Sequence, residues 1–254
     1  MIQDLHAHTY YSFCGEDTPE AIVEAAIAAG IDTFGITDHN HGIGHACTAV
    51  FYEQNALPPN APPHDYGRTL RRYYDHINLI REKYANRIRV LRGIEVCTLG
   101  GEGYYGHPLP DTADISYFDY CLIENLDDPR SVTGGDLFAY AKRCGCPWVG
   151  VAHTDLFAHI RRLGADPHDY LSRMAEQHIF WEMNISYDAI HHYREHSYML
   201  EFFKNSDWQD AVRRAGVRVS IGFDGHRVGD YRPDRVLHFN RALTEMGIKK
   251  PFEV

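Results

Sequence analysis

The stretch GITDHNH, residues 35–41, links the fold of this chain to a polar site. It closes an apolar run and ends on Asp38, His39 and His41, three side chains that bind protons or metal ions. A strand that only packs against a core can end on any turn residues. The same combination, an apolar run followed by acidic or imidazole side chains, recurs at the end of almost every predicted strand.

Seven short segments are predicted as strands because they are rich in apolar and β-branched residues and are followed by turn residues. They span residues 1–6, 33–37, 88–95, 119–123, 147–152, 179–185 and 217–222. Helical patterns separate most of them, at residues 19–30, 70–85, 135–145, 167–177, 207–216 and 233–247. In the first helix we expect Thr18 as the N-cap, Pro19 at the first position and Gly30 as the stop. Strands that alternate with helices indicate a parallel sheet, and seven such units predict a closed barrel.

The chain is predicted to form one barrel domain over residues 1–254, with a Pro-rich insertion around residues 40–67. This insertion is either a lid over one end of the barrel or a plain surface loop. No apolar run approaches the ~20 residues that cross a bilayer. The first residues, MIQDLHAH, lack the basic and apolar regions of a signal peptide. We therefore expect a cytoplasmic protein without a membrane partner.

Acidic residues outnumber basic residues by 35 to 25, which gives a formal net charge of -10. A surface that binds extended DNA or RNA requires the opposite sign, so nucleic acid is not expected as a partner. The 17 histidines are numerous, but their placement matters more than their number. Nothing in the sequence fixes the oligomeric state.

Polar side chains follow the predicted strands, at the end where barrels of this type hold their active sites. They are His6, His8, Asp38, His39, Glu95, Glu124, Asn125, His153, Asp155, Glu182, Asn184, Asp224 and His226. Any one of them alone is more often a cap or turn residue than a ligand. Their joint occurrence instead predicts one shared metal site, in which His6 and His8 lie on the same face of a strand.

The types of ligand indicate which ions would bind. Imidazole nitrogen combined with carboxylate oxygen suits Zn²⁺, Fe²⁺ or Mn²⁺, whereas an oxygen-only set suits Mg²⁺ or Ca²⁺. The candidates exceed the four ligands that one tetrahedral ion needs. We therefore expect two or three divalent transition-metal ions that share Glu95 as a bridge.

The order of four motifs resembles that of the polymerase and histidinol phosphatase (PHP) family of metal-dependent phosphoesterases. DLHAHT, ITDHN, GIE and GFDGH match its first to fourth motifs and together span nearly the whole chain. The resemblance implies a distorted (β/α)7 barrel that holds up to three metal ions. Carried over by motif, the ligands of the first ion are His6, His8, Glu95 and Asp224, those of the second are Glu95 and His153, and those of the third are His39 and His226.

Two positions depart from the family pattern. Many members have a histidine six residues after the second histidine of the opening motif, where this chain has Cys14. Many also have a histidine ligand shortly after the fourth strand, where this chain reads CLIENLDD. Cys14, Glu124 and Asn125 are therefore weaker candidates to complete the metal sites. Within the family, HTDLFAHIRR and WEMNIS resemble the corresponding segments of histidinol phosphatases.

The leading hypothesis is a histidinol-phosphatase-like enzyme that hydrolyses a small phosphomonoester, with histidinol phosphate as the first guess. Metal ions would polarise the phosphoryl oxygens and generate hydroxide as the nucleophile. In-line attack also needs positive groups that hold the phosphate, and the candidates are Arg161, Arg162 and Arg227. The candidate catalytic groups, which would protonate the leaving alkoxide, orient a ligand or stabilise the phosphate, are Asp38, His153, Asp155 and Arg161.

Two other classes of function are alternatives. A metal-dependent amidohydrolase also opens with Asp-x-His-x-His, as Asp4, His6 and His8 do here, although such enzymes generally have a longer, eight-stranded barrel. A metal-stabilised module without catalytic activity is the other, because Cys14 and Asn125 depart from the family pattern. Hydrolysis of amides, hydrolysis of phosphomonoesters, and bound metal without turnover distinguish the three.

Overall fold

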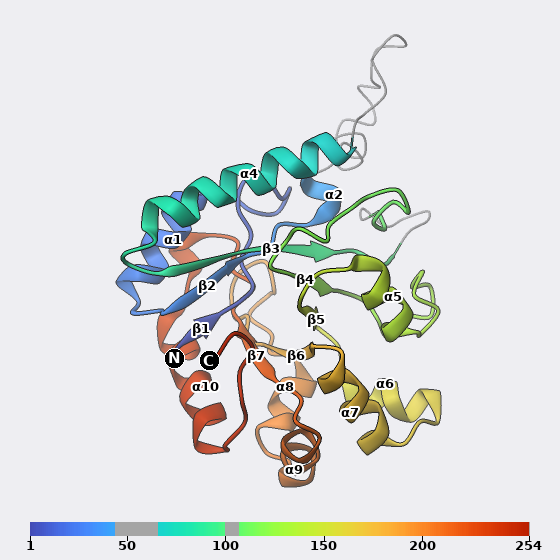
Figure 1. Cartoon of the computed structure of the whole chain (residues 1–254). Helices are drawn as coiled ribbons and strands as arrows, with labels where there is room; N and C mark the ends of the chain where they lie inside the picture. Colours follow the sequence, from blue (N-terminus) through green and yellow to red (C-terminus); the bar gives the residue numbers. More distant parts are fainter. Residues whose placement is uncertain (44–65, 100–106, 254) are drawn as a thin grey trace.

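The computed structural model describes residues 1–43, 66–99 and 107–253, and these residues form a ring of seven β-strands (Figure 1). The strands are β1 (Gln3–Asp4), β2 (Thr33–Ile36), β3 (Arg89–Val96), β4 (Tyr120–Ile123), β5 (Val149–Val151), β6 (Ile179–Asn184) and β7 (Val219–Gly222). All neighbours are parallel, and their order in the sheet follows their order in the chain. Every predicted strand is thus confirmed, and the fold is the predicted distorted (β/α)7 barrel.

The ring is nearly closed between its first and last strands. The backbone N–H of Asp224 donates to the carbonyl of His6 over 2.8 Å. Ala7 and Gly225 form an isolated parallel bridge. These contacts lie just beyond the short regular segments of β1 and β7, and we call them the β1–β7 seam. The barrel is distorted here because residues outside the regular strands complete it.

A small apolar cluster fills the inside of the barrel. It consists of Leu5, Leu91, Tyr120, Leu122, Ala152 and Phe180. The Tyr120 ring needs room that glycine leaves, since a Cβ added at Gly35 would lie 1.8 Å from its hydroxyl oxygen and one at Gly93 would lie 2.7 Å from its Cζ. The hydroxyl donates to the Leu5 carbonyl over 2.7 Å and so ties β4 to the end of β1 across the barrel.

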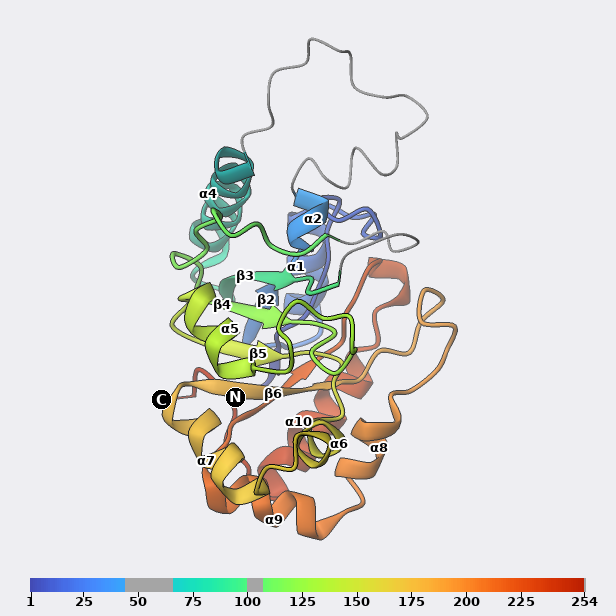
Figure 2. The same ribbon diagram turned by 90° about the vertical axis from the view of Figure 1, so that its right-hand side faces the viewer.

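Helices cover the outside of the ring (Figure 2). Those in the described residues are α1 (Pro19–Ala28), α2 (Asn40–Ile43), α4 (Tyr66–Tyr84), α5 (Leu137–Cys144), α6 (Leu156–Leu163), α7 (Pro167–Glu176), α8 (Ser197–Phe202), α9 (Ser206–Ala215) and α10 (Pro233–Glu245), with the 3-10 helix η2 (Val228–Asp230). The longest, α4, packs against β3 and buries Leu70, Tyr73, Ile77 and Ile80. This spacing of three and four residues puts the four side chains on one face. None of the described helices combines the length and apolar character of a membrane span.

The observed helix ends show which helix boundaries the sequence predicted correctly. α1 begins as predicted, because Thr18 Oγ1 accepts a hydrogen bond from the Ala21 N–H over 3.2 Å, and Gly30 with φ of 74° lies just beyond its end. α4 begins at Tyr66, earlier than the predicted residue 70. The short helices α2, α6 and α8 are absent from the predicted set. Of the predicted Pro-rich insertion, residues 44–65 lie outside the described residues.

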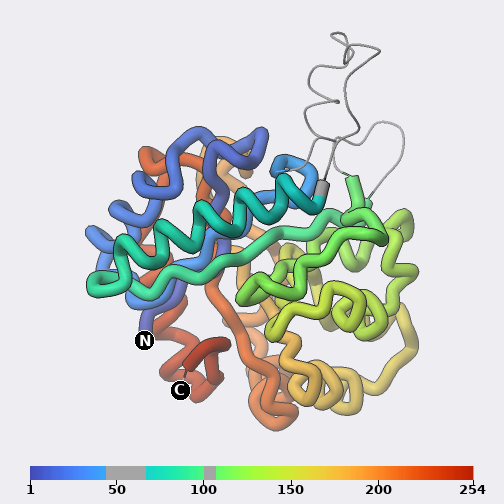
Figure 3. Tube along the Cα trace, turned by 45° about the horizontal axis from the view of Figure 1, so that its top comes forward, coloured from blue at the N-terminus to red at the C-terminus, as the bar shows by residue number. Residues whose placement is uncertain are grey.

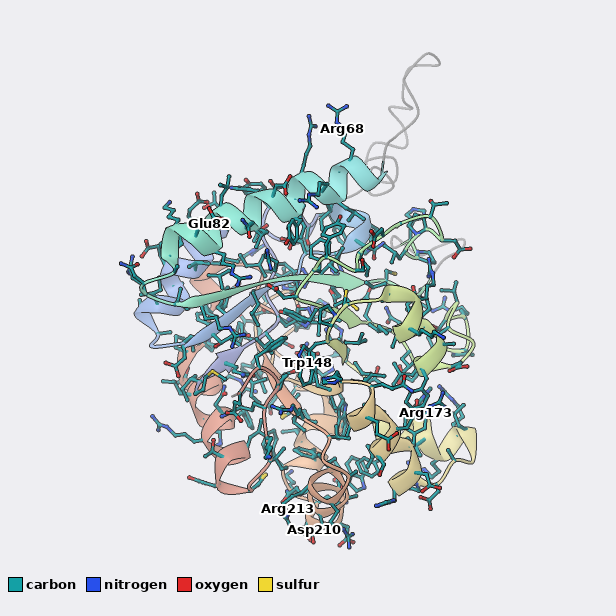
Figure 4. The ribbon with its side chains drawn as sticks, viewed as in Figure 1. Arg68, Glu82, Trp148, Arg173, Asp210 and Arg213 are labelled. Atoms are coloured by element: carbon teal, nitrogen blue, oxygen red, sulfur yellow. The ribbon has the colours of Figure 1, made fainter. Side chains whose placement is uncertain are left out.

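The two chain ends lie side by side at the amino-terminal end of the barrel (Figures 1 and 3). The Arg89 guanidinium donates to the Phe252 carbonyl over 3.0 Å. Phe252 and Trp148 pack against the inner apolar cluster, and Trp148 lies over the middle of the ring of strands (Figure 4). These residues close the amino-terminal end, which leaves the carboxyl-terminal mouth as the place for a site.

Candidate metal centre

Seven of the predicted ligands meet at the carboxyl-terminal mouth of the barrel. In β3, alternate residues face inward, so that Leu91 belongs to the apolar cluster while Glu95 lies above it at the mouth. The residues that follow the other strands approach Glu95 from around the ring. We call the set the metal-site cluster: His6, His8, His39, Glu95, His153, Asp224 and His226.

Glu95 lies in the middle of the metal-site cluster. Its Oε1 is 3.3 Å from Nε2 of His6 and 3.6 Å from Nε2 of His153. Its Oε2 is 2.8 Å from Nδ1 of His39 and 3.5 Å from Nε2 of His8. Each carboxylate oxygen thus faces two imidazoles, which is the arrangement that a carboxylate bridging two ions requires.

Asp224 is the second carboxylate of the metal-site cluster. Its Oδ1 is 3.0 Å from Nε2 of His8 and 3.4 Å from Nε2 of His6, and its Oδ2 is 3.2 Å from Nε2 of His153. The side-chain amide of Asn184 donates to Oδ2 over 3.1 Å and fixes the carboxylate. His6, His8 and His153 therefore lie between two acidic groups.

Several buried ligand atoms of the metal-site cluster have no hydrogen-bond partner within the described part of the chain. They are both carboxylate oxygens of Glu95, Oδ1 of Asp224, Nδ1 of His39, Nε2 of His153 and Nδ1 of His226. Each buried polar atom left in this way costs on the order of 1–3 kcal/mol. The ligand atoms of His6, His8 and Glu95 lie within 4.8 Å of one another, as do those of His6, His153 and Asp224. Imidazole nitrogen and carboxylate oxygen suit Zn²⁺, Fe²⁺ or Mn²⁺, so the residues present fit such ions.

Glu182 and Ser12 orient the two histidines of the opening motif. Nδ1 of His6 is 2.6 Å from Oε1 of Glu182, and Nδ1 of His8 is 3.2 Å from the hydroxyl of Ser12. Each contact occupies Nδ1 and leaves Nε2 directed at the metal-site cluster. Outer hydrogen bonds of this kind set the tautomer and ring orientation of histidine ligands.

Asp38, a predicted catalytic group, is buried and already has three donors. Its carboxylate accepts hydrogen bonds from the backbone N–H of Thr9 over 2.7 Å, from the Thr9 hydroxyl over 2.8 Å and from the Ser12 hydroxyl over 2.7 Å. Burial raises the pKa of Asp38, although the hydrogen bonds from Thr9 and Ser12 oppose the rise. The geometry gives Asp38 a positioning role, because it holds the turn that carries His8.

The imidazole of His191 at the mouth is absent from the predicted set. His191, in the loop after β6, has Nδ1 2.7 Å from Oδ1 of Asp188 and Nε2 3.0 Å from Oδ2 of Asp224. Asp188 orients this ring as Glu182 orients that of His6. The sequence signal was weak, because His191 and His192 are adjacent in a loop and nothing in the pattern shows which one faces the site.

The three weaker candidates also lie near the metal-site cluster. The ligand atoms of Cys14, His8 and His226 fall within 4.8 Å of one another. Burial raises the pKa of the Cys14 thiol, but hydrogen bonds with His226 and His39 outweigh it and lower the pKa below its ordinary value. Oε1 of Glu124 is 4.0 Å from Nδ1 of His39, and Asn125 follows Glu124 directly.

The backbone is left-handed where three strands deliver residues to the mouth. The φ angle is 59° at Asn125, 51° at His153 and 57° at Asp224. Non-glycine residues in this region cost of the order of 1–3 kcal/mol when the conformation is strained, and they gather at functional sites. The chain accepts this conformation after β4, β5 and β7, at the points where it turns away from the barrel.

Opposite charges keep the two central carboxylates of the metal-site cluster ionised. Burial lowers the pKa of His6, but the charges of Asp224, Glu182 and Glu95 together raise it well above the ordinary value. Burial raises the pKa of Glu95 and of Asp224, yet the imidazoles around them hold both well below the ordinary range. Both carboxylates are therefore anionic at neutral pH and able to bind a cation.

Four other predicted residues lie apart from the metal-site cluster. The Asp155 carboxylate accepts from the Ala158 N–H over 2.9 Å and caps α6. The Arg162 guanidinium donates to the Asp127 carbonyl, and Arg227 pairs with Glu16 over 2.7 Å. Arg161 is exposed on α6. Among the residues that the structure describes, no hydrogen bond or ion pair joins these four side chains to the metal-site cluster.

The comparisons with known proteins identify a family and similar solved structures. The solved structure of histidinol phosphate phosphatase from Lactococcus lactis, complexed with zinc, L-histidinol and phosphate, has a TM-score of 0.57 and 16% identity, and the match covers 98% of this chain and 95% of that chain. A putative histidinol phosphatase from Listeria monocytogenes has a TM-score of 0.47 and 15% identity, over 90% of this chain and 96% of that chain. A search of the curated proteins found no match. The family model described as the PHP domain matches residues 4–227, and the chain therefore belongs to the PHP domain family.

Proposed function

We propose that this chain is a metal-dependent phosphoesterase that hydrolyses a small phosphomonoester. The observation that carries the proposal is the set of buried, unpartnered oxygen and nitrogen atoms that converge on Glu95 and Asp224. Membership in the PHP domain family supports it. The ions would be two or three of Zn²⁺, Fe²⁺ or Mn²⁺, according to the ligand types.

The chain's own residues would hold these ions on both sides of Glu95. His6, His8 and Asp224 surround one position, and His153 faces both carboxylates from the other side. When bound, such ions supply a Lewis acid for phosphoryl oxygens and a source of hydroxide at neutral pH. Glu182, Ser12 and Asp188 keep the imidazole rings oriented before substrate arrives, so that little reorganisation is needed during the reaction.

Substrate would approach from the more exposed side of the metal-site cluster. The side chains of His39, His153 and His191 are 12%, 25% and 18% exposed, whereas His6 and Glu95 are fully buried. A phosphate group in this opening would contact those three imidazoles.

Three arginines that follow ligand-bearing strands are the proposed further phosphate ligands. Arg227 directly follows His226, and its ion pair with Glu16 is exposed and therefore weak, so a phosphate would compete with Glu16 for its guanidinium. Arg161 and Arg162, on α6 after β5, are proposed for the same role.

L-Histidinol phosphate is the first substrate to test. The similar Lactococcus lactis structure contains L-histidinol and phosphate together with zinc. Those two molecules are the two parts of that ester. Nucleotide and sugar monophosphates are the other members of the same chemical class, and they belong in the same panel.

A phosphate-release assay tests the proposed activity. Protein loaded with Zn²⁺ or Mn²⁺ should release phosphate from a member of a panel that contains histidinol phosphate, nucleotides, sugar phosphates and p-nitrophenyl phosphate. His6→Ala should abolish release because it removes a central ligand, whereas His238→Ala, on the exposed face of α10, should not. Hydrolysis of amides alone would favour the amidohydrolase alternative, and bound metal without turnover would favour a non-catalytic module.

A further inference from the structure

Beside the metal-site cluster, next to α2, lies a group of buried ligand atoms that the roles above leave unexplained. It consists of His41, in α2, and Glu124, after β4, and it adjoins His39 of the metal-site cluster. His41 is 2% exposed and Glu124 is 6% exposed. The ligand atoms of His39, His41 and Glu124 lie within 4.8 Å of one another.

None of these ligand atoms is satisfied by the described part of the protein. Nδ1 of His41, Nδ1 of His39 and Oε1 of Glu124 are buried and have no hydrogen-bond partner there. Oε2 of Glu95 also meets no hydrogen-bond criterion there, although it lies 2.8 Å from Nδ1 of His39. Nδ1 of His41 and Oε1 of Glu124 are thus left without a partner in the described residues, next to the close contact between His39 and Glu95. The four atoms come from α2, β3 and the ends of β2 and β4.

Backbone contacts hold these side chains in place without using their ligand atoms. Asn40 accepts a hydrogen bond from the Cys97 N–H over 2.7 Å and so fastens α2 to the end of β3. The Glu124 N–H donates to the Val96 carbonyl over 3.1 Å, and the Thr98 hydroxyl donates to the Glu124 carbonyl over 2.7 Å. The two side chains are thus presented by segments that are already fixed, as a preorganised site requires.

A buried carboxyl group can also persist as a neutral acid that donates to an imidazole. The geometry disfavours this alternative, because Oε1 of Glu124 is 4.0 Å from Nδ1 of His39, which is too far for a hydrogen bond. A tetrahedral ion with bonds of about 2.1 Å places its ligand atoms roughly 3.4 Å apart. The 2.8 Å and 4.0 Å separations on either side of Nδ1 of His39 bracket that value.

We propose that His41 and Glu124, together with His39 and Oε2 of Glu95, form a metal position of their own for Zn²⁺ or a similar divalent ion. The site rests on the proposed metal-dependent function, since it shares Glu95 and His39 with the metal-site cluster. It assigns His41 and Glu124 as ligands, and it places one ion on the α2 side of Glu95 in addition to the ions near His6 and His153.

The test counts metal ions in the full-length protein. Wild type, His41→Gln, Glu124→Gln and the double variant are each reconstituted with Zn²⁺ and freed of excess metal. The number of zinc ions per chain is then measured for each. Each single variant and the double variant should lose the same one equivalent, because the two residues serve one ion. The matched controls His238→Gln and Glu176→Gln, which replace exposed residues, should keep the full number.

Reconstitution with Co²⁺ gives a second readout, because removal of one site should remove part of the visible absorption in both single variants. An unchanged zinc count in the single variants would overturn the proposal, and so would separate, additive losses.

Circular dichroism shows whether each variant folds. If a Gln variant does not fold, Glu124→Asp retains a carboxylate and should bind the ion more weakly, whereas unaltered affinity would contradict the assignment. The count is independent of turnover, so an inactive protein that still loses one equivalent would refute the proposed activity and keep the site.

Discussion

At the scale of single residues, Glu182 acts on the metal-site cluster through His6. Its Oε1 is 2.6 Å from Nδ1 of His6, and its Oε2 accepts the backbone N–H of His153 over 3.2 Å. Glu182→Ala removes the acceptor that fixes the His6 ring. We expect the affinity for Zn²⁺ to fall about 10–100-fold, as measured by competition with a chromophoric chelator.

A conservative variant separates orientation from charge in this prediction. Glu182→Gln keeps an oxygen that accepts from His6, so it should recover most of the lost affinity. Glu176→Ala, on the exposed side of α7, is the control and should bind zinc as the wild type does. Equal losses in the Ala and Gln variants would show that the charge of Glu182 matters rather than its positioning of His6.

The strand patterns in the sequence predicted which residues at the strand ends form the centre of the site. They did not predict which residues of the following helices and loops face it. His6 and His8 could be placed together because alternate residues of a strand share a face, and Glu95 joined them because the carboxyl ends of the strands meet at one mouth. His41 and His191 lie in a short helix and a loop, where no periodicity shows the direction of a side chain. Asp155 illustrates the converse, since an aspartate after a strand can be a helix cap or a catalytic acid, and here it caps α6.

At the scale of secondary-structure elements, a partly buried ion pair reinforces the contact between β3 and β4. The Asp119 carboxylate accepts from Nη2 of Arg92 over 2.7 Å, from its Nε over 3.1 Å and from its backbone N–H over 2.9 Å. Asp119→Asn keeps the shape and removes the charge, so the free energy of unfolding in urea at neutral pH should fall by about 1–3 kcal/mol. Glu24→Gln, in the exposed pair with Arg87, should cost much less.

The same ion pair predicts how stability depends on pH. Burial raises the pKa of Asp119, but hydrogen bonds from Arg92 and its charge outweigh burial and lower the pKa below 3.8. A carboxylate of this kind stabilises the fold above its unfolded pKa, and the contribution is lost as pH falls through the folded pKa. The difference in unfolding free energy between wild type and Asp119→Asn should be constant above about pH 5 and shrink below about pH 4. A difference that grows on acidification would contradict the assignment.

The pattern and the length of each element both bear on which elements were predictable. The strands are buried on both faces, so they form continuous apolar runs that end abruptly in polar residues. α1 and α4 are long enough, and well enough capped or patterned, to show a helical period. α8 spans 6 residues, which is too short for a period to stand out from the loops around it. α6 spans 8 residues, as many as the predicted α5, so its length alone does not explain why it was missed.

At the scale of the whole molecule, the β1–β7 seam serves both the barrel and the metal centre. The N–H of Asp224 donates to the carbonyl of His6, while the side chains of both residues face Glu95 or each other at the mouth. The number of predicted strands indicated a closed barrel. It did not indicate which residues join the first strand to the last. That contact depends on the tilt and stagger of all seven strands together, and no local pattern encodes it.

Gly222 tests whether closure and metal binding depend on each other. An added Cβ there would lie 2.1 Å from Oε1 of Glu182 and 2.7 Å from Cβ of His6, so Gly222→Ala must displace one of them. We expect the variant to lose about 1–3 kcal/mol of stability from overpacking. It should also gain less thermal stability from Zn²⁺ than the wild type does. Gly229→Ala is the control, because a Cβ there meets no atom within 4 Å. If Gly222→Ala is destabilised but shows the full zinc-induced rise in unfolding temperature, the seam supports the barrel alone and the metal centre is built independently of it.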